Sequence, residues 1–171
     1  MRSHFIIKAL SETPPWGSLL AAREKEYETR SWQTRHRGWV AIHASKMFPD
    51  RAKWLCWQEP FLSSLIKAGI ATFRDREGVA RVYVSRIPTQ AILGIGFLAD
   101  CIPTEELMHG NRLTGKERSF GDFSPDRWAW RFERVIALPD PIPCKGDRGL
   151  WTPPADVCRQ LEDLIISKVV A

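Results

Sequence analysis

The segment from residue 25 to residue 45, KEYETRSWQTRHRGWVAIHAS, places ionisable side chains beside apolar strand residues. Glu28 and Arg30 are two positions apart, so in an extended segment they project to the same side, about 7 Å from each other. A carboxylate accepts hydrogen bonds from the exocyclic amines of bases, and a guanidinium fork suits phosphate oxygens. Lys25 adds a phosphate contact, or a base if burial lowers its pKa. These three residues predict a site for binding or acid–base chemistry, with a structural ion pair as the alternative.

The end of the same segment offers a histidine and a serine two residues apart, His43 and Ser45. Such a pair can act as base and nucleophile, but no acid that would orient the histidine lies nearby in the sequence. A lone histidine on an apolar strand is more often satisfied within the core. We therefore expect His43 to be structural, and Ser45 and Lys46 to cap the next turn and reach a phosphate.

Further positive and aromatic residues surround this segment. Arg35, Arg37 and His36 add to the local charge, and the whole chain carries a net charge of +5, which favours an anionic partner. Trp32 lies on the same side as Glu28, either in the core or as a stacking wall, and Trp16 is a second candidate wall. The pattern favours a basic cleft that binds nucleic acid.

Residues 103–125 are polar, contain three glycines and show no clear period. We expect a mobile loop or lid over the site. Its carboxylates Glu117 and Asp122 are the acidic groups most readily brought toward the cleft.

Composition narrows the class of protein. Hydrophobic residues make up 44% of the 171 residues and charged residues 26%, as in ordinary globular proteins. The four cysteines form no CxxC pair, and there is no GxGxxG or P-loop pattern, so we expect no metal and no cofactor. The first apolar run is too short for a signal peptide and no stretch approaches about 20 apolar residues, which predicts a cytoplasmic protein with no membrane association.

Hydrophobic periodicity predicts an α+β fold in one domain, residues 1–171. Short strands spread evenly between helices favour a small barrel over a doubly wound sheet. The segment 36–45 should be a strand buried on both faces, because apolar residues occur on both of its sides. Strands are also expected at 4–10, from 27 onward, and at 79–87, 90–102, 128–138 and 150–151, and helices from Thr13 to 23–25, at 50–65 with a second turn from Pro60, and at about 153–170.

Three stretches resemble the activating signal cointegrator homology (ASCH) family, which has a PUA-like barrel. They are PPWGSLLAAREKEYETRSWQTRHRGWVAIHASK (14–46), RIPTQAILGIGFLADCI (86–102), and ERSFGDFSPDRWAW (117–130) followed by PIPCKGDRGLW (141–151). They cover a little over half of the chain in the expected order. The resemblance implies a mixed pseudo-barrel with flanking helices and a cleft between the first helix and the strands, proposed in the family to bind RNA or another nucleic acid.

The bacterial acetylcytidine amidohydrolases are small relatives of this family that use a lysine, a threonine three positions later and a glutamate. Lys25 matches the lysine and Arg30 matches a following arginine, whereas Glu28 occupies the threonine position. This substitution removes the hydroxyl that a nucleophilic mechanism needs, so the resemblance favours binding over catalysis.

The leading prediction is therefore an ASCH domain that binds RNA or single-stranded nucleic acid, with an unspecified number of chains. Its expected contacts are Lys25, Glu28, Arg30, Trp32, Arg37, Ser45, Lys46 and Trp16. The alternative is a hydrolase, an amidohydrolase or ribonuclease acting on acetylated cytidine or RNA, with Lys25 as base and Glu28, Glu117 or Asp122 as partner. A protein-interaction adaptor is the third.

Overall fold

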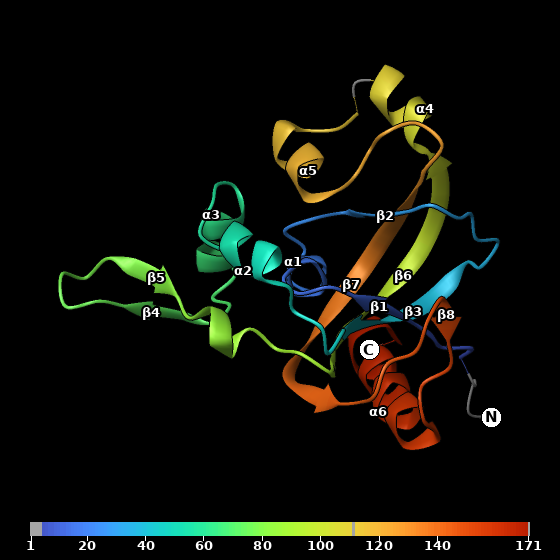
Figure 1. The fold of residues 1–171 in the computed structure, drawn as a ribbon. Helices are drawn as coiled ribbons and strands as arrows, with labels where there is room; N and C mark the ends of the chain where they lie inside the picture. Colours follow the sequence, from blue (N-terminus) through green and yellow to red (C-terminus); the bar gives the residue numbers. More distant parts are fainter. Residues whose placement is uncertain (1–4, 111, 171) are drawn as a thin grey trace.

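A six-stranded sheet curls into a half-barrel with helices along its flanks (Figure 1). The computed structural model describes residues 5–110 and 112–170. The strand order is β2-β7-β6-β3-β1-β8, and β1 and β3 are the parallel pair. The strands are β1 (Lys8–Glu12), β2 (Tyr27–Arg30), β3 (Gly38–Ala44), β6 (Ala91–Pro103), β7 (Trp128–Pro143) and β8 (Leu150–Trp151). The predicted α+β fold class is confirmed.

Two long antiparallel strands, β6 and β7, give the sheet its curl. Their register shifts at three places between Ile92 and Asp100, and each such bulge bends and twists a strand. Gly94 allows the two backbones to approach, because a Cβ there would lie 2.5 Å from the carbonyl oxygen of Ile136. The sheet therefore encloses side chains on its concave face.

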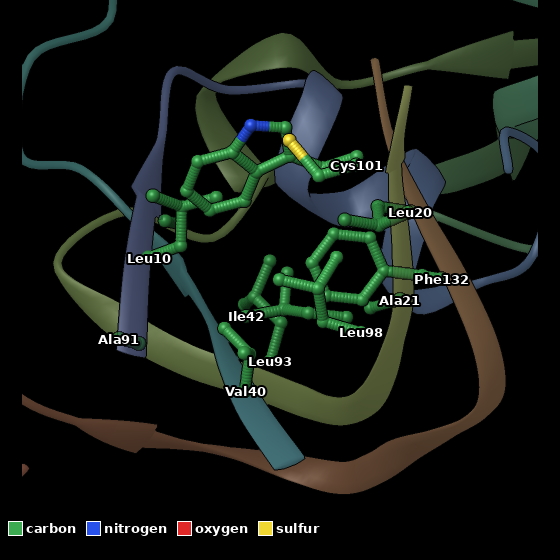
Figure 2. Packing of buried hydrophobic residues seen from close by; sticks show 12 residues of the cluster. Leu10, Leu20, Ala21, Val40, Ile42, Ala91, Leu93, Leu98, Cys101 and Phe132 are labelled. Atoms are coloured by element: carbon green, nitrogen blue, oxygen red, sulfur yellow. The ribbon is translucent and has the colours of Figure 1, made fainter. Parts of the chain in front are cut away.

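The concave face holds the inner cluster, a set of buried residues that α1 (Trp16–Ala21) covers (Figure 2). Leu20 and Ala21 of α1 lie in it with Leu98 of β6, and Trp130 of β7 is fully buried there. The cluster comprises Leu10, Leu20, Ala21, Val40, Ile42, Ala44, Ala91, Leu93, Leu98, Cys101, Trp130 and Phe132.

The opposite face of the sheet carries the outer cluster, which α6 (Ala155–Ile165) covers. Its members are Ile7, Ala9, Trp39, Ala41, Ile92, Ile95, Cys144, Val157, Leu161 and Ile165. Alternate residues of β3 enter the two clusters, with Val40 and Ile42 inside and Trp39 and Ala41 outside. The prediction that this strand is buried on both faces is confirmed.

A third cluster, the flank cluster, joins α1 to two short helices, α2 (Asp50–Leu55) and α3 (Phe61–Lys67). It consists of Leu19, Cys56, Phe61, Leu65, Val82, Val84, Ile87 and Phe120. Next to it a separate hairpin, β4 (Thr72–Arg74) with β5 (Ala80–Val82), extends away from the half-barrel (Figure 1).

Several predicted boundaries need correction. The strand expected at 79–87 is β5 alone, followed by a 3₁₀ turn, Val84–Arg86, which lets Val84 and Ile87, three residues apart, bury in the same cluster. The first strand lies later than the predicted 4–10, because it pairs with β3 from Lys8 to Glu12; residue 4 lies outside the described residues.

The first helix also differs from its prediction. It begins at Trp16 with Pro15 at the N-cap and no side-chain cap, so Thr13 contributes its carbonyl oxygen, which accepts from the Trp16 amide at 3.0 Å. It ends at Ala21, before the expected 23–25, because Glu24 and Lys25 turn back to donate their amides to Leu19 O.

The segment 103–125, predicted as a loop, contains α4 (Thr104–His109) and α5 (Gly115–Phe120). Each helix is too short to show a period in the sequence, yet Leu107 and Phe120 are almost fully buried. The Thr114 hydroxyl accepts from the Glu117 amide and caps α5. Buried anchors and a cap thus order a segment whose composition resembles a loop.

The closing helix agrees with its prediction: α6 spans Ala155–Ile165 and a wider helical turn, Ile166–Val170, follows it. Across the described part of the chain, every helix is too short or too polar to cross a bilayer.

Candidate nucleic-acid site

A pocket of about 550 Å³ opens between α1, β1, β2, α2 and the end of α5. This volume lies in the range of roughly 300–1,000 Å³ that small-ligand sites occupy. Apolar groups form its walls and charged groups lie at its base. The lining residues are Ser11, Glu12, Thr13, Trp16, Glu28, Thr29, Arg30, Pro49, Arg51, Ala52, Leu55, Ser119, Phe120, Gly121 and Asp122.

Four charged side chains form the base of this pocket and the layer behind it. Lys25 Nζ makes an ion pair with Glu28 Oε2, and Glu28 Oε1 lies 3.3 Å from Arg30 Nε. Arg30 Nη2 lies 3.4 Å from Glu12 Oε2 and donates to the carbonyl oxygen of Ser11 at 2.9 Å. We call Glu12, Lys25, Glu28 and Arg30 the charged base. It pairs two cations with two carboxyl groups.

Glu12 is the member of the charged base that sequence reasoning missed. It ends β1 and its side chain is only 2% exposed. A Cβ on Gly17 would lie 3.0 Å from Glu12 Cβ, so α1 packs directly over it. The one signal in the sequence was a glutamate that ends an apolar strand just before the first helix.

The two carboxyl groups differ in their affinity for a proton. Burial, together with the nearby negative charge of Glu28, raises the pKa of Glu12 from an ordinary 4.5 to about 8. Burial would also raise the pKa of Glu28, but the positive charges of Lys25 and Arg30 outweigh it and lower that pKa. At neutral pH the pair therefore holds one proton, on Glu12.

Of the residues predicted for the site, Lys25, Glu28 and Arg30 come together as expected. The Lys25 side chain is 0% exposed, so it lies behind Glu28 rather than on the pocket surface. Trp16 lines the pocket, where its ring meets Phe61 edge-on at 5.5 Å.

Four other predicted contacts lie away from the pocket lining. Trp32 packs edge-on against Trp130, with ring centroids 4.6 Å apart, beside the inner cluster. Arg37 pairs with Asp100 at 3.4 Å, Ser45 donates to the carbonyl oxygen of Met47, and Lys46 is exposed.

The two predicted acidic partners have different positions. Asp122 lines the pocket, where its carboxylate accepts from Ser124 and lies 3.3 Å from Arg127. Glu117 instead accepts from the backbone amides of Glu26 and Tyr27, and burial raises its pKa. Glu117 therefore anchors α5 to the start of β2.

His43 has both ring nitrogens bonded. Nε2 lies 2.8 Å from the carbonyl oxygen of Cys144 and Nδ1 lies 3.1 Å from Ser11 Oγ. Burial lowers its pKa. This geometry agrees with the structural role expected for it.

Two further parts of the pocket were absent from the prediction. Arg51 and Leu55 are four residues apart and therefore share one face of α2, and Phe120 ends α5. A period of four in a short helix is too common a pattern to reveal them. Among the described residues no cluster of histidine, cysteine, aspartate and glutamate could hold a metal ion.

A curled half-barrel sheet with flanking helices is a mixed α+β architecture that the chain shares with solved ASCH structures. In a comparison with protein-family models, none matches the chain. In sequence it is similar to activating signal cointegrator 1 of Homo sapiens, with 32% identity over 99 residues, and to that of Mus musculus, with 26% identity over 148 residues. These matches cover 57% and 83% of the chain but only 15% and 21% of the relatives' length.

In structure the chain is similar to the crystal structure of ASCH from Zymomonas mobilis, with a TM-score of 0.53 and 11% identity, over 92% of this chain and 94% of that one. A single-site variant of the same bacterial protein matches with the same TM-score over 94% and 97%. At this identity the structures show the fold alone. Taken with the sequence matches, they confirm the predicted resemblance to the ASCH domain family and the predicted mixed pseudo-barrel with flanking helices.

Proposed function

We propose that the pocket binds RNA or another single-stranded nucleic acid by taking in one unstacked nucleotide. The observation that carries this proposal is the combination of apolar walls and a charged base in a pocket of about 550 Å³ on a PUA-like fold. A base needs a flat apolar wall and a few fixed polar groups, and its phosphate needs a cation near the opening.

The lining residues divide into these roles. The half-buried Trp16 ring supplies the aromatic wall, and Glu28, with 12% of its side chain exposed, accepts from the amine of a base. Arg51 is exposed at the pocket, where it meets a phosphate. Lys25 holds Glu28 in place instead of contacting the ligand, since its side chain is fully buried.

An exposed surface beside the pocket can bind the nucleotides that adjoin the one inside the pocket. Trp54 is 55% exposed and Trp57 is 53% exposed, at α2 and just after it. Trp54 is three residues from Arg51, so the two are neighbours on the helix surface. Exposed indoles stack bases without regard to sequence, which suits the nucleotides outside the pocket.

The test is a titration with short single-stranded RNA and DNA at two salt concentrations, followed by fluorescence anisotropy. We expect binding at low salt, and we expect Arg51→Ala to weaken it roughly 3–10-fold and to lower the salt slope by about 0.7, the value for one lost phosphate contact on a single strand. Arg159→Ala is the matched control, because Arg159 is also exposed but lies on α6 and does not line the pocket. No binding at low salt, or equal affinity in Arg51→Ala and wild type, would contradict the proposal.

A hydrolase acting on RNA or a modified base is the second candidate. One feature favours it: burial raises the pKa of Glu12 while Lys25 and Arg30 lower the pKa of Glu28, and two carboxyl groups whose pKa values differ can supply a general acid and a general base. Recovering the RNA after the titration separates the two functions, because shortened RNA indicates hydrolysis. The open pocket favours both over a protein-interaction adaptor.

A further inference from the structure

We propose that Glu12, through its pairing with Glu28, makes the pocket select a base with an exocyclic amine beside an unprotonated ring nitrogen, cytosine or adenine, over uracil. This inference rests on the proposed binding of an unstacked nucleotide and names the chemical class of base that the pocket accepts.

The first argument is an unsatisfied buried atom. Glu12 Oε1 is buried and has no hydrogen-bond partner among the described residues, while Oε2 lies 3.4 Å from Arg30 Nη2. A buried carboxyl oxygen without a partner is unfavourable and calls for a proton, a water or a ligand to satisfy it. A proton on Oε1 lowers the cost of burying this carboxyl group and leaves an O–H donor for which a ligand in the pocket can supply the acceptor.

The second argument is the charge around the pair. Lys25 and Arg30 face it from the β2 side, Arg51 lines the same pocket from α2, and Asp122 lines it after α5. Lys25 and Arg30 are the only ones in ion-pair contact with the two carboxyl groups in the described chain. Those cations lower the pKa of Glu28, so it stays ionised. Burial raises the pKa of Glu12 to about 8, so Glu12 is mostly neutral at physiological pH.

A pair with one proton offers one O–H donor and several acceptor oxygens. Cytosine presents the complement: ring N3 accepts the O–H, and the two amine hydrogens are donated to carboxyl oxygens. Adenine offers the same pattern at N1 and N6. Uracil places a carbonyl oxygen where the amine would be, so that oxygen would face the ionised Glu28 carboxylate. Cytosine and uracil have nearly the same size, so a difference in affinity between them reports on their hydrogen bonds to the carboxyl pair.

The proton also makes the selection dependent on pH. Above about pH 8 Glu12 ionises, and the carboxyl pair loses its O–H donor for ring N3. Glu12→Gln keeps a neutral side chain with an N–H donor and a C=O acceptor at every pH. Glu12→Ala removes both groups.

The experiment compares oligocytidine and oligouridine of about six nucleotides, at about pH 6.5 and about pH 8.5, by fluorescence anisotropy. For wild type we expect cytidine to bind about 10-fold more tightly than uridine at the lower pH, with this ratio falling to about 3-fold or less at the higher pH. Glu12→Gln should keep the ratio at both values, and Glu12→Ala should lose it at both. Circular dichroism of each variant confirms that it is folded.

The outcomes separate this inference from the proposed function. Binding of both oligomers with equal affinity, or a wild-type ratio that does not change with pH, overturns the inference and leaves the proposed function standing. Absence of binding to either oligomer at low salt overturns the proposed function itself. The wild-type ratio at two pH values decides the matter even if Glu12→Gln fails to fold.

Discussion

Burial decides what each member of the charged base does. Lys25, Glu28 and Arg30 are all charged in the sequence, yet their side chains are 0%, 12% and 25% exposed. Removing one partner of a buried ion pair leaves an uncompensated charge, which destabilises a protein by about 3–5 kcal/mol. Lys25 therefore belongs to the support of the pocket, and Glu28 and Arg30 to its surface.

Glu12 should make the stability of the fold depend on pH. The folded state raises its pKa from 4.5 to about 8, so its favourable contribution is complete below about pH 4.5 and is lost as the pH rises through about 8. We expect the free energy of unfolding of the wild type to fall across this window by a few kcal/mol, on the order given by about 1.4 kcal/mol per unit of pKa.

Urea denaturation at a series of pH values measures this dependence. Glu12→Gln should lose less stability across the window because an amide does not ionise. Glu106→Gln is the matched control, since Glu106 is an exposed glutamate on α4, and it should follow the wild type. Parallel curves for Glu12→Gln and wild type would show that Glu12 holds no extra proton.

The pocket depends on elements that are individually weak. α1, α2 and α5 have six residues each, too few to be stable alone, and tertiary contacts hold them. Glu24 is a clear case, because its buried carboxylate pairs with Lys67 of α3 and Lys116 of α5. Such ion pairs hold the short helices around the pocket in position.

The close approach of β6 and β7 gives a prediction at this scale. Gly94→Ala places a methyl group 2.5 Å from a backbone carbonyl oxygen, which neither strand can relieve without shifting, so it should lower the free energy of unfolding by about 1–3 kcal/mol. Gly115→Ala, at the first turn of α5 where nothing lies within 4 Å, should be neutral or stabilise by about 0.5 kcal/mol. Urea denaturation measures both, and equal effects would contradict the proposed backbone contact.

The inner, outer and flank clusters share elements, which links these three clusters into one structure. β3 and β6 contribute to both the inner and outer clusters, and α1 contributes to the inner and flank clusters. Each cluster contains one buried cysteine: Cys101 in the inner, Cys144 in the outer and Cys56 in the flank cluster. The thiols therefore report separately on the opening of each cluster.

We expect the three buried thiols to resist alkylation in the native state and to become reactive at the same urea concentration. Burial removes access and raises each pKa, for Cys56 to about 12, so the reactive thiolate is scarce. Cys158, which is only partly buried, serves as the internal control and should react first. Mass spectrometry of alkylated peptides gives the midpoint for each site; separate midpoints would contradict the predicted single domain.

The sequence alone was sufficient for the fold class and for the proximity of three members of the charged base. Apolar runs predicted the strands β3 and β6, and alternating apolar residues predicted β7, because side-chain direction in a strand depends only on position. Lys25, Glu28 and Arg30 were found together because they are close along the chain and match a family pattern. Both predictions succeeded because each depends only on residues that are close to one another along the chain.

Only the tertiary structure brought Glu12, Arg51 and Phe120 to the same pocket, and only it moved Trp32 to the core beside Trp130. These residues come from elements far apart along the chain, and no local sequence pattern predicts that they lie close together in space. The same holds for their chemistry: a glutamate has an ordinary pKa until a fold buries it beside a second carboxylate. Residue type and spacing determined only that Lys25, Glu28 and Arg30 act together, and long-range packing decided which other groups join them, which carboxyl group has a raised pKa and which side chains face the pocket.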